Sequence, residues 1–285
     1  MKVLAVIATK GGEGKTTTAA NLGGFAADAG LRVLLVDLDV QPTLSSYFAL
    51  SHKAAGGIYE LLAENEQRAE KIISHTTIPT LDLVLSNDAQ GQLNTLLLHA
   101  ADGRLRLRNL RSIFESDYDL MVIDTQGARS VSLEMAVLAC DLALSPVTPE
   151  ILAARELQRG TVQLMQDIAP FRHWGIPLPK LHLLINRVHP VSANARTIQQ
   201  ALRTHFGRHD RISILDTHVP LLEAYPHASM KALPVHRVER RKPKGRRAPA
   251  ALETMRSLMS ELFPEWAPRF GRVTGTASDI ENLHG

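Results

Sequence analysis

The sequence predicts an α/β fold in which a doubly wound, mostly parallel sheet carries helices on both faces. Three observations lead to this prediction. Short apolar runs alternate with helical patterns along the chain, and several runs are apolar on both faces, as strands covered on both sides are. The 285 residues, 45% of them hydrophobic, can bury a sizeable core. We expect a single domain over residues 1–262 that binds its ligand at the carboxyl ends of the strands.

The expected elements follow from local patterns. Apolar residues recur with helical spacing from Leu22 to Ala29, and Gly30 is a common C-terminal stop, so a first helix follows the first strand. A last amphipathic helix is expected at about 250–262. Periodicity is then lost, so residues 263–285 are expected to form an irregular tail. The expected strands are 3–8, 32–38, 81–86, 118–124, 141–147 and 180–186.

Composition excludes several classes of protein. The single cysteine, Cys140, rules out a disulfide framework and fits a reducing compartment, so we expect a cytoplasmic protein. The chain runs from Met1 directly into an apolar strand, which predicts neither a signal peptide nor a membrane span.

Positive charge is concentrated in one segment, RVERRKPKGRR at residues 237–247. The whole chain carries +3, whereas this segment holds seven Lys or Arg against one Glu, so the rest of the chain is mildly acidic. Basic residues without interleaved aromatics are typical of contacts to the phosphate backbone of DNA rather than to bases. Pro243 and Gly245 equally allow a solvated loop. The expected DNA-binding residues are Arg237, Arg240, Arg241, Lys242, Lys244, Arg246 and Arg247, with Arg104, Arg108 and Arg111 as a second basic stripe.

The stretch TKGGEGKTTTAANL, residues 9–22, lies between the first expected strand and helix, as a phosphate-binding loop does. Its glycines let backbone N–H groups converge on phosphates, and the helix N-terminus adds partial positive charge. Lys15 is expected to hold the β- and γ-phosphates and Thr16 to ligate Mg²⁺. The fold is therefore predicted to be that of a P-loop NTPase. The expected nucleotide-binding residues of the loop are Gly11, Gly12, Glu13, Gly14, Lys15, Thr16 and Thr17.

The loop carries a second lysine, Lys10, after Thr9, where the ordinary P-loop pattern starts with Gly. KGGxGKTT resembles the deviant P-loop of ParA and MinD type ATPases. The resemblance implies ATP and Mg²⁺ as cofactors and an ATP-bound homodimer in which Lys10 reaches the partner's phosphates. A cation supplied by the partner neutralises phosphate charge only when the dimer is assembled.

Two further stretches extend the resemblance and supply acidic residues. LLVDLDVQPTLSSYF, residues 34–48, is similar to the family's second strand and switch I, which implies that Asp39 positions the attacking water and Asp37 supports the metal's outer shell. VIDTQGA, residues 122–128, is similar to the Walker B strand and switch II, which implies that Asp124 reaches Mg²⁺ through water. The alternative for Asp37 and Asp39 is two acidic residues that end a strand.

Three more residues are nucleotide contacts by resemblance. Gly127 would offer its N–H to the γ-phosphate. LLINRV, residues 183–188, is similar to the strand whose Asn contacts adenine, which makes Asn186 a candidate, although Asn also favours strand-to-loop corners. HVPLLEAY, residues 218–225, is similar to the loop that packs on the base, with Pro220 as a contact.

The sequence departs from the family pattern at Glu13, where a small apolar residue is usual, and at the Asp-Thr-Gln-Gly of switch II. A carboxylate near polyphosphate is repelled unless it points away or finds a cation. The sequence leaves open whether Glu13 does so, faces the partner subunit or slows hydrolysis.

The resemblance implies a DNA partition ATPase whose ATP dimer binds DNA non-specifically on the nucleoid. A ParB-like centromere-binding protein would stimulate its slow hydrolysis. Because the chain starts at the P-loop strand, no N-terminal helix-turn-helix domain is expected. The alternative is a MinD-like positioning ATPase that binds membrane through its last helix. That helix is not expected to bind lipid, because its polar face carries Glu253, Arg256 and Glu261 and so lacks cationic bias.

Overall fold

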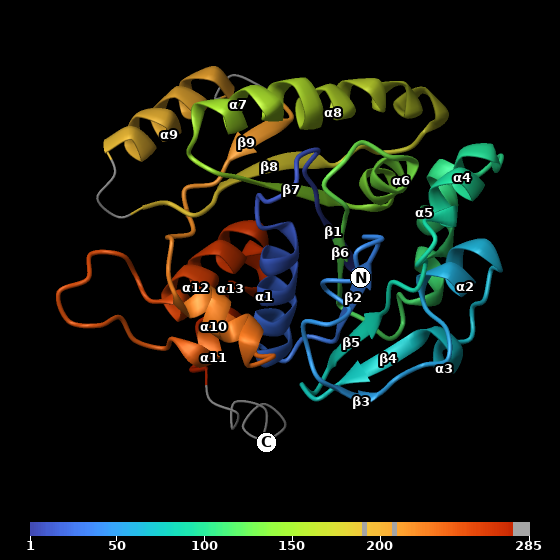
Figure 1. Ribbon diagram of the computed structural model, residues 1–285, viewed down its shortest axis with the longest axis horizontal. Helices are drawn as coiled ribbons and strands as arrows, with labels where there is room; N and C mark the ends of the chain where they lie inside the picture. The colour runs from blue at the N-terminus through green and yellow to red at the C-terminus, as the bar shows by residue number, and fades with distance from the viewer. Residues whose placement is uncertain (190–192, 207–209, 276–285) are drawn as a thin grey trace.

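The structure, a computed structural model, describes residues 1–189, 193–206 and 210–275, and within them one mixed sheet forms the centre of the molecule (Figure 1). The strand order is β3-β4-β5-β2-β6-β1-β7-β8-β9. The strands are β1 Lys2–Val6, β2 Val33–Asp37, β3 Leu50–His52, β4 Ile73–Thr76, β5 Leu81–Val84, β6 Leu120–Asp124, β7 Leu142–Val147, β8 Lys180–Ile185 and β9 Ile212–Ile214.

Helices cover both faces of the sheet. On one face α1 packs with α10 to α13, and on the other face α4 to α9 pack against β1, β6, β7 and β8 (Figure 1). Each face of the sheet has its own hydrophobic core, and alternate residues of a strand contribute to the two cores. In β1, Leu4 and Val6 pack on the α1 face, and Val3 and Ala5 pack on the other face. The α-helices are α1 Lys15–Asp28, α2 Ile58–Ala63, α3 Ala69–Ile72, α4 Gln92–His99, α5 Arg106–Leu110, α6 Val131–Ala139, α7 Ile151–Leu157, α8 Gln163–Asp167, α9 Ala193–Phe206, α10 Ala224–Met230, α11 Val235–Val238, α12 Ala251–Leu262 and α13 Ala267–Phe270. Short 3₁₀ or π segments are Gly103–Leu105, Arg111–Ile113, Gln158–Val162, Ala169–Trp174 and Pro264–Trp266.

The predicted doubly wound fold is confirmed. All six expected strands are present as β1, β2, β5, β6, β7 and β8, and they pair in parallel. The sequence patterns missed three short strands. β9 adds in parallel to β8, whereas β3 and β4 add an antiparallel edge beside β5.

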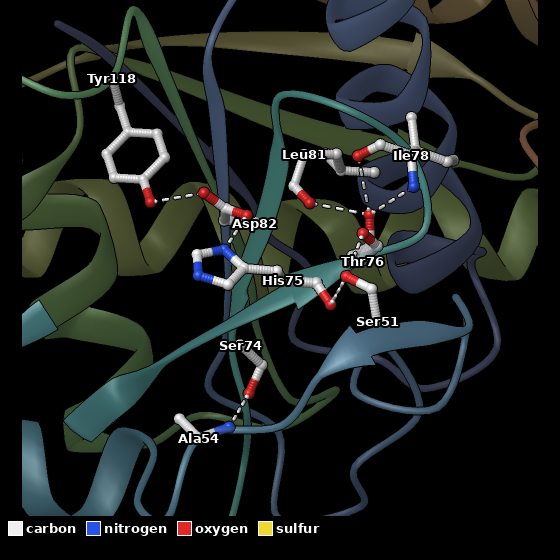
Figure 2. Close-up of polar contacts among 9 residues, drawn as sticks. All are labelled: Ser51, Ala54, Ser74, His75, Thr76, Ile78, Leu81, Asp82 and Tyr118. Atoms are coloured by element: carbon white, nitrogen blue, oxygen red, sulfur yellow. Dashed lines mark hydrogen bonds and ion pairs between the residues drawn. The ribbon is translucent and has the colours of Figure 1, made fainter. Parts of the chain in front are cut away.

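Side-chain hydrogen bonds fix this antiparallel edge (Figure 2). Ser74 of β4 is fully buried and accepts a hydrogen bond from the N–H of Ala54 at 3.0 Å. Asp82 of β5 accepts one from the Tyr118 hydroxyl at 2.8 Å and lies 2.7 Å from Nδ1 of His75. Polar residues thus connect these short strands to the segment before β6, which explains why an apolar pattern does not reveal β3 and β4.

The prediction of an irregular tail is wrong for residues 263–275. Phe263, Phe270 and Val273 are almost fully buried, and Arg256 donates a hydrogen bond to the Val273 carbonyl at 2.7 Å. These apolar residues recur every three to seven positions and pack onto α12 and α1, while the prolines at 264 and 268 restrict the helical turns to short pieces. Residues 276–285 of the predicted tail lie outside the described residues. None of the helices within the described ranges is long and apolar enough to cross a membrane.

Candidate nucleotide-binding site

The loop between β1 and α1 has the backbone geometry of an anion site. Gly12 and Gly14 adopt φ angles of 84° and 88°, in the left-handed region that side chains disfavour. A Cβ at Gly14 would also lie 2.5 Å from Nδ2 of Asn186, so a side chain does not fit there. Gly14 is the N-cap of α1 and supplies no side-chain cap, so the first N–H groups of the helix lack a partner within it. Phosphate binding fits this helix start.

Lys15 is a buried cation at the base of the loop, with only 7% of its surface exposed. Burial lowers the pKa of Lys15, and the nearby carboxylates of Asp124, Asp39 and Glu13 oppose that effect. The structure thus brings the P-loop lysine together with the predicted acidic residues of both switch regions.

Asp124, at the end of β6, is the most strongly perturbed acid of the site. Burial raises its pKa to about 8, Asp37 adds to the shift, and a hydrogen bond with Thr16 opposes it. Its Oδ2 atom is buried and has no hydrogen-bond partner among the described residues. A carboxylate oxygen in this state fits a cation, and Mg²⁺ bound to a nucleotide needs only one or two protein carboxylates.

Asp37, at the end of β2, organises the segment that follows it. Its Oδ2 accepts hydrogen bonds from the N–H of Ser45 at 2.8 Å and the hydroxyl of Ser45 at 2.7 Å, and its Oδ1 accepts one from the N–H of Asp39 at 3.1 Å. Burial raises the pKa of Asp37 to about 6, against these hydrogen bonds. Asp39 is only half-buried, and its Oδ1 accepts a hydrogen bond from the N–H of Gln41 at 3.0 Å. Asp37 therefore shapes switch I, while Asp39 lies at the surface of the site.

Switch II packs directly on the mouth of the P-loop. A Cβ at Gly127 would lie 2.8 Å from the Cα of Gly11 and 3.1 Å from the carbonyl oxygen of Lys10. Thr125 anchors the segment, because its hydroxyl donates a hydrogen bond to the Val6 carbonyl of β1 at 2.9 Å. The glycine at 127 is required by this close approach of two loops.

The Glu13 carboxylate contacts both the residue after β7 and a cation of its own loop. Its Oε2 accepts a hydrogen bond from the N–H of Thr148 at 2.8 Å, and its Oε1 lies 3.4 Å from Nζ of Lys10. The Glu13 side chain is 7% exposed, whereas that of Lys10 is 41% exposed. Of the alternatives left open by the sequence, the structure thus shows that Glu13 finds a cation, Lys10, within its own subunit.

A cavity of about 390 Å³ adjoins Gly14 and the first turns of α1. The predicted base contacts Asn186 and Pro220 both line it. The amide of Asn186 is already engaged, since Nδ2 donates to the Glu13 carbonyl at 2.8 Å and Oδ1 accepts from the Arg187 N–H at 3.0 Å. The polar lining residues that the sequence analysis did not single out include Asn21 and Ser229. A polar residue among apolar ones on the buried side of the first helix, as Asn21 is, was the available signal.

The predicted DNA-binding segment divides into two groups. Arg237 forms a bidentate pair with the buried Asp28 at 2.7 and 2.5 Å, and Arg246 forms one with Glu239 at 2.7 and 2.6 Å. Because these two arginines are paired within the fold, we propose that the DNA contacts of the segment come mainly from its other cations. The segment between α11 and α12 extends away from the helices (Figure 1). Its exposed cations are Arg240, Arg241, Lys242, Lys244 and Arg247.

The second basic stripe also makes contacts within the fold. Nε of Arg104 lies 2.6 Å from Oε2 of Glu134, and Nη1 of Arg111 lies 3.0 Å from Oδ1 of Asp141. Arg108 donates to the Leu138 carbonyl at 3.2 Å. The stripe therefore holds the α5 region against α6 and the start of β7.

Comparisons with known proteins identify the family of the chain. A family model described as "AAA domain" matches residues 1–173. A ParA family protein of Chlamydia pneumoniae is 30% identical over 183 residues, covering 62% of this chain and 71% of the relative. The chromosome partitioning protein ParA of Caulobacter vibrioides is 27% identical over 230 residues, covering 79% of this chain and 84% of the relative.

Solved structures show the same fold. An ATP complex of a McdA variant from Cyanothece superimposes with a TM-score of 0.72 at 19% identity, covering 100% of this chain and 96% of the other. Cobyrinic acid a,c-diamide synthase from Mycobacterium smegmatis, with bound ADP and magnesium, gives a TM-score of 0.67 at 25% identity, covering 88% and 98%. With a family model over more than half of its length and a ParA relative at 30% identity, the chain belongs to the ParA/MinD family of deviant P-loop ATPases and is of the ParA type.

Proposed function

We propose that this chain is an ATP-dependent DNA partition ATPase that switches between a monomer and an ATP-bound homodimer. The observation that carries the proposal is the unequal placement of two lysines in one loop. Lys15 is buried at the base of the phosphate site, whereas Lys10 is 41% exposed at its mouth. An exposed lysine at the mouth is available to a second subunit, and the buried one is not.

Within one subunit, the loop N–H groups and Lys15 would hold the phosphates of ATP. Thr16 and Asp124 would hold Mg²⁺, which neutralises charge on the β- and γ-phosphates when it is bound. The buried, unpartnered oxygen of Asp124 supports this assignment. The cavity beside Gly14 would take the base, with Pro220 and the apolar side chains of α12 packed against it.

Hydrolysis requires a water in line with the γ-phosphate, and Asp39 is the residue we assign to position it. Its partly exposed carboxylate lies close enough to Lys15 to oppose the lowering of that lysine's pKa by burial. Lys10 from the partner subunit would stabilise the negative charge that develops on the phosphate. A monomer lacks that cation, so we expect turnover by the free protein well below the usual range of about 1 to 10³ s⁻¹.

The output would be non-specific binding to DNA on the nucleoid. The five exposed cations between α11 and α12 suit contacts to phosphates, and a dimer doubles their number. A ParB-like protein would act as the partner that stimulates hydrolysis and so releases the DNA.

The second candidate is a MinD-like positioning ATPase that binds membrane. It needs a free amphipathic helix, and α12 is the last long helix of the described residues. Leu252, Met255 and Met259, on its apolar face, are at most 7% exposed and pack in the core with α1. This packing disfavours membrane attachment through α12.

Binding of duplex DNA with ATP, with ADP and without nucleotide tests the proposal. We expect tight, sequence-independent binding only with ATP, and loss of that binding in Lys10→Ala, which should still bind ATP as a monomer. Anionic liposomes serve as a parallel ligand. Binding to liposomes and not to DNA would favour the MinD-like candidate, and a fast turnover insensitive to DNA would exclude both.

A further inference from the structure

The departure from the family pattern at Glu13 forms a second contact network beneath the P-loop. Glu13 receives the Thr148 N–H from the end of β7, while its own carbonyl accepts from Asn186 at the end of β8. The end of β7 therefore holds its carboxylate, and the end of β8 holds its main chain. Only Lys10, among the residues that contact this carboxylate, is a flexible and partly exposed side chain.

The ammonium group of Lys10 has two binding positions in this proposal and can occupy only one of them at a time. In the monomer its ammonium group lies 3.4 Å from Oε1 of Glu13 in the same subunit. In the dimer proposed above it lies against the partner's phosphates. One ammonium group cannot satisfy both places, so each subunit must give up its internal pair when the dimer forms.

We propose that Glu13 is a positioning residue that holds Lys10 within its own subunit and thereby raises the protein concentration needed for the ATP dimer. This inference rests on the proposed function, because it needs Lys10 to act across the dimer. A small apolar residue at position 13 would leave Lys10 without a counter-ion in the monomer. This chain would then assemble less readily than relatives with the usual loop, which adds a threshold to the nucleotide switch.

The substitution Glu13→Gln removes the negative charge of the side chain and keeps its size and shape. The Gln side chain keeps an oxygen that can accept from Thr148, and it loses the ion pair with Lys10. Dimer formation breaks one partly exposed ion pair in each subunit of the parent and none in the variant. We therefore expect the dissociation constant of the ATP dimer, measured by sedimentation with Mg-ATP, to be about 2- to 30-fold lower in the variant. Glu13→Val, which also removes the acceptor, separates the contribution of the Thr148 hydrogen bond.

A second measurement reports on the pair without any dimer. Acylation of Lys10 in the nucleotide-free monomer, followed by mass spectrometry, should be faster in Glu13→Gln than in the parent, with the exposed Lys242 as internal reference. A purely structural role of Glu13 would not change this rate in an isosteric variant.

The outcomes separate the inference from the function it rests on. Equal rates of Lys10 acylation in the parent and in Glu13→Gln would show that Glu13 does not hold Lys10 in the monomer. Faster acylation in the variant with an unchanged dissociation constant of the ATP dimer would show that the pair exists but does not raise the concentration needed for dimer formation. Absence of an ATP dimer in the parent at every concentration would instead remove the proposed function and, with it, the role of Glu13, even if the labelling shows that the pair exists.

Discussion

Replacing Arg240 and Arg241 by alanine gives the sharpest test of DNA binding through the segment between α11 and α12. Both side chains are exposed, and neither takes part in an ion pair that holds the described fold together. If each cation displaces one counter-ion from DNA, the double variant loses up to four phosphate contacts per dimer. The slope of log affinity against log salt should then become less steep by up to about 3.6, at about 0.9 for each contact.

Fluorescence anisotropy with Mg-ATP measures this slope, at salt concentrations from roughly 50 to 200 mM and on duplexes of unrelated sequence. The loss should be the same on every duplex, because phosphates carry no sequence information. Arg246→Ala is the matched control. It removes a cation from the same segment, but one already paired with Glu239, so it should lower stability and leave the slope unchanged.

An unchanged salt slope in the double variant, with Arg246→Ala also unchanged, would refute the reasoning. Arg240 and Arg241 would then be solvated, and removing Lys242, Lys244 and Arg247 as well would show whether the whole segment is. If the slope stays unchanged without all five cations, DNA contacts would have to come from another surface, and the stripe at Arg104, Arg108 and Arg111 is already engaged in contacts within the fold.

Three further predictions address the nucleotide site and the fold. Lys15→Ala should abolish ATP binding in a titration, because the loop loses its buried cation; unchanged affinity would remove the P-loop assignment. Asp39→Ala should lose turnover while the ATP dimer and its DNA binding persist, as sedimentation and anisotropy would detect, since phosphate contacts do not depend on Asp39. Asp28→Asn should lower the free energy of unfolding by about 3–5 kcal/mol at neutral pH, because a buried carboxylate paired with Arg237 and His236 loses its charge. Burial raises the pKa of Asp28, but hydrogen bonds from Arg237 and His236 outweigh it and leave the pKa lowered. The difference between parent and variant in urea denaturation should therefore be full above the unfolded pKa, about 3.9, and shrink as the pH falls through the folded value; a difference independent of pH would contradict the pairing.

Local patterns were sufficient for the central sheet and the phosphate loop. Apolar runs in the sequence were enough to predict every parallel strand from β1 to β8, because a run that is apolar on both faces is stable mainly when it is buried in a sheet. The ISHT sequence of β4 has no such pattern, and its strand depends on partners in β3 and β5. Edge strands of this kind are set by tertiary context.

The chemistry of the site was predictable where it is local and unpredictable where it depends on distant residues. The Gly and Lys positions of the P-loop follow from spacing alone. The direction of the Glu13 carboxylate depends on Thr148, 135 residues away, and the pairing of Arg237 within the fold depends on Asp28, 209 residues away. Neither partner carries a sequence signal that links it to its counterpart.

The α1 helix connects the phosphate site to the start of the basic segment by rigid contacts. Asn21, which lines the base cavity, accepts a hydrogen bond from the Val235 N–H at 2.6 Å, and Asp28 holds Arg237. A Cβ at Gly24 would lie 2.7 Å from the Pro234 side chain, so the two segments are in close contact. Because the segment is fixed at its base to the helix that carries the loop, nucleotide binding need not reorder it. In the proposed function, ATP then controls DNA binding through the number of basic segments that one dimer presents, and a monomer with either nucleotide should bind DNA equally weakly.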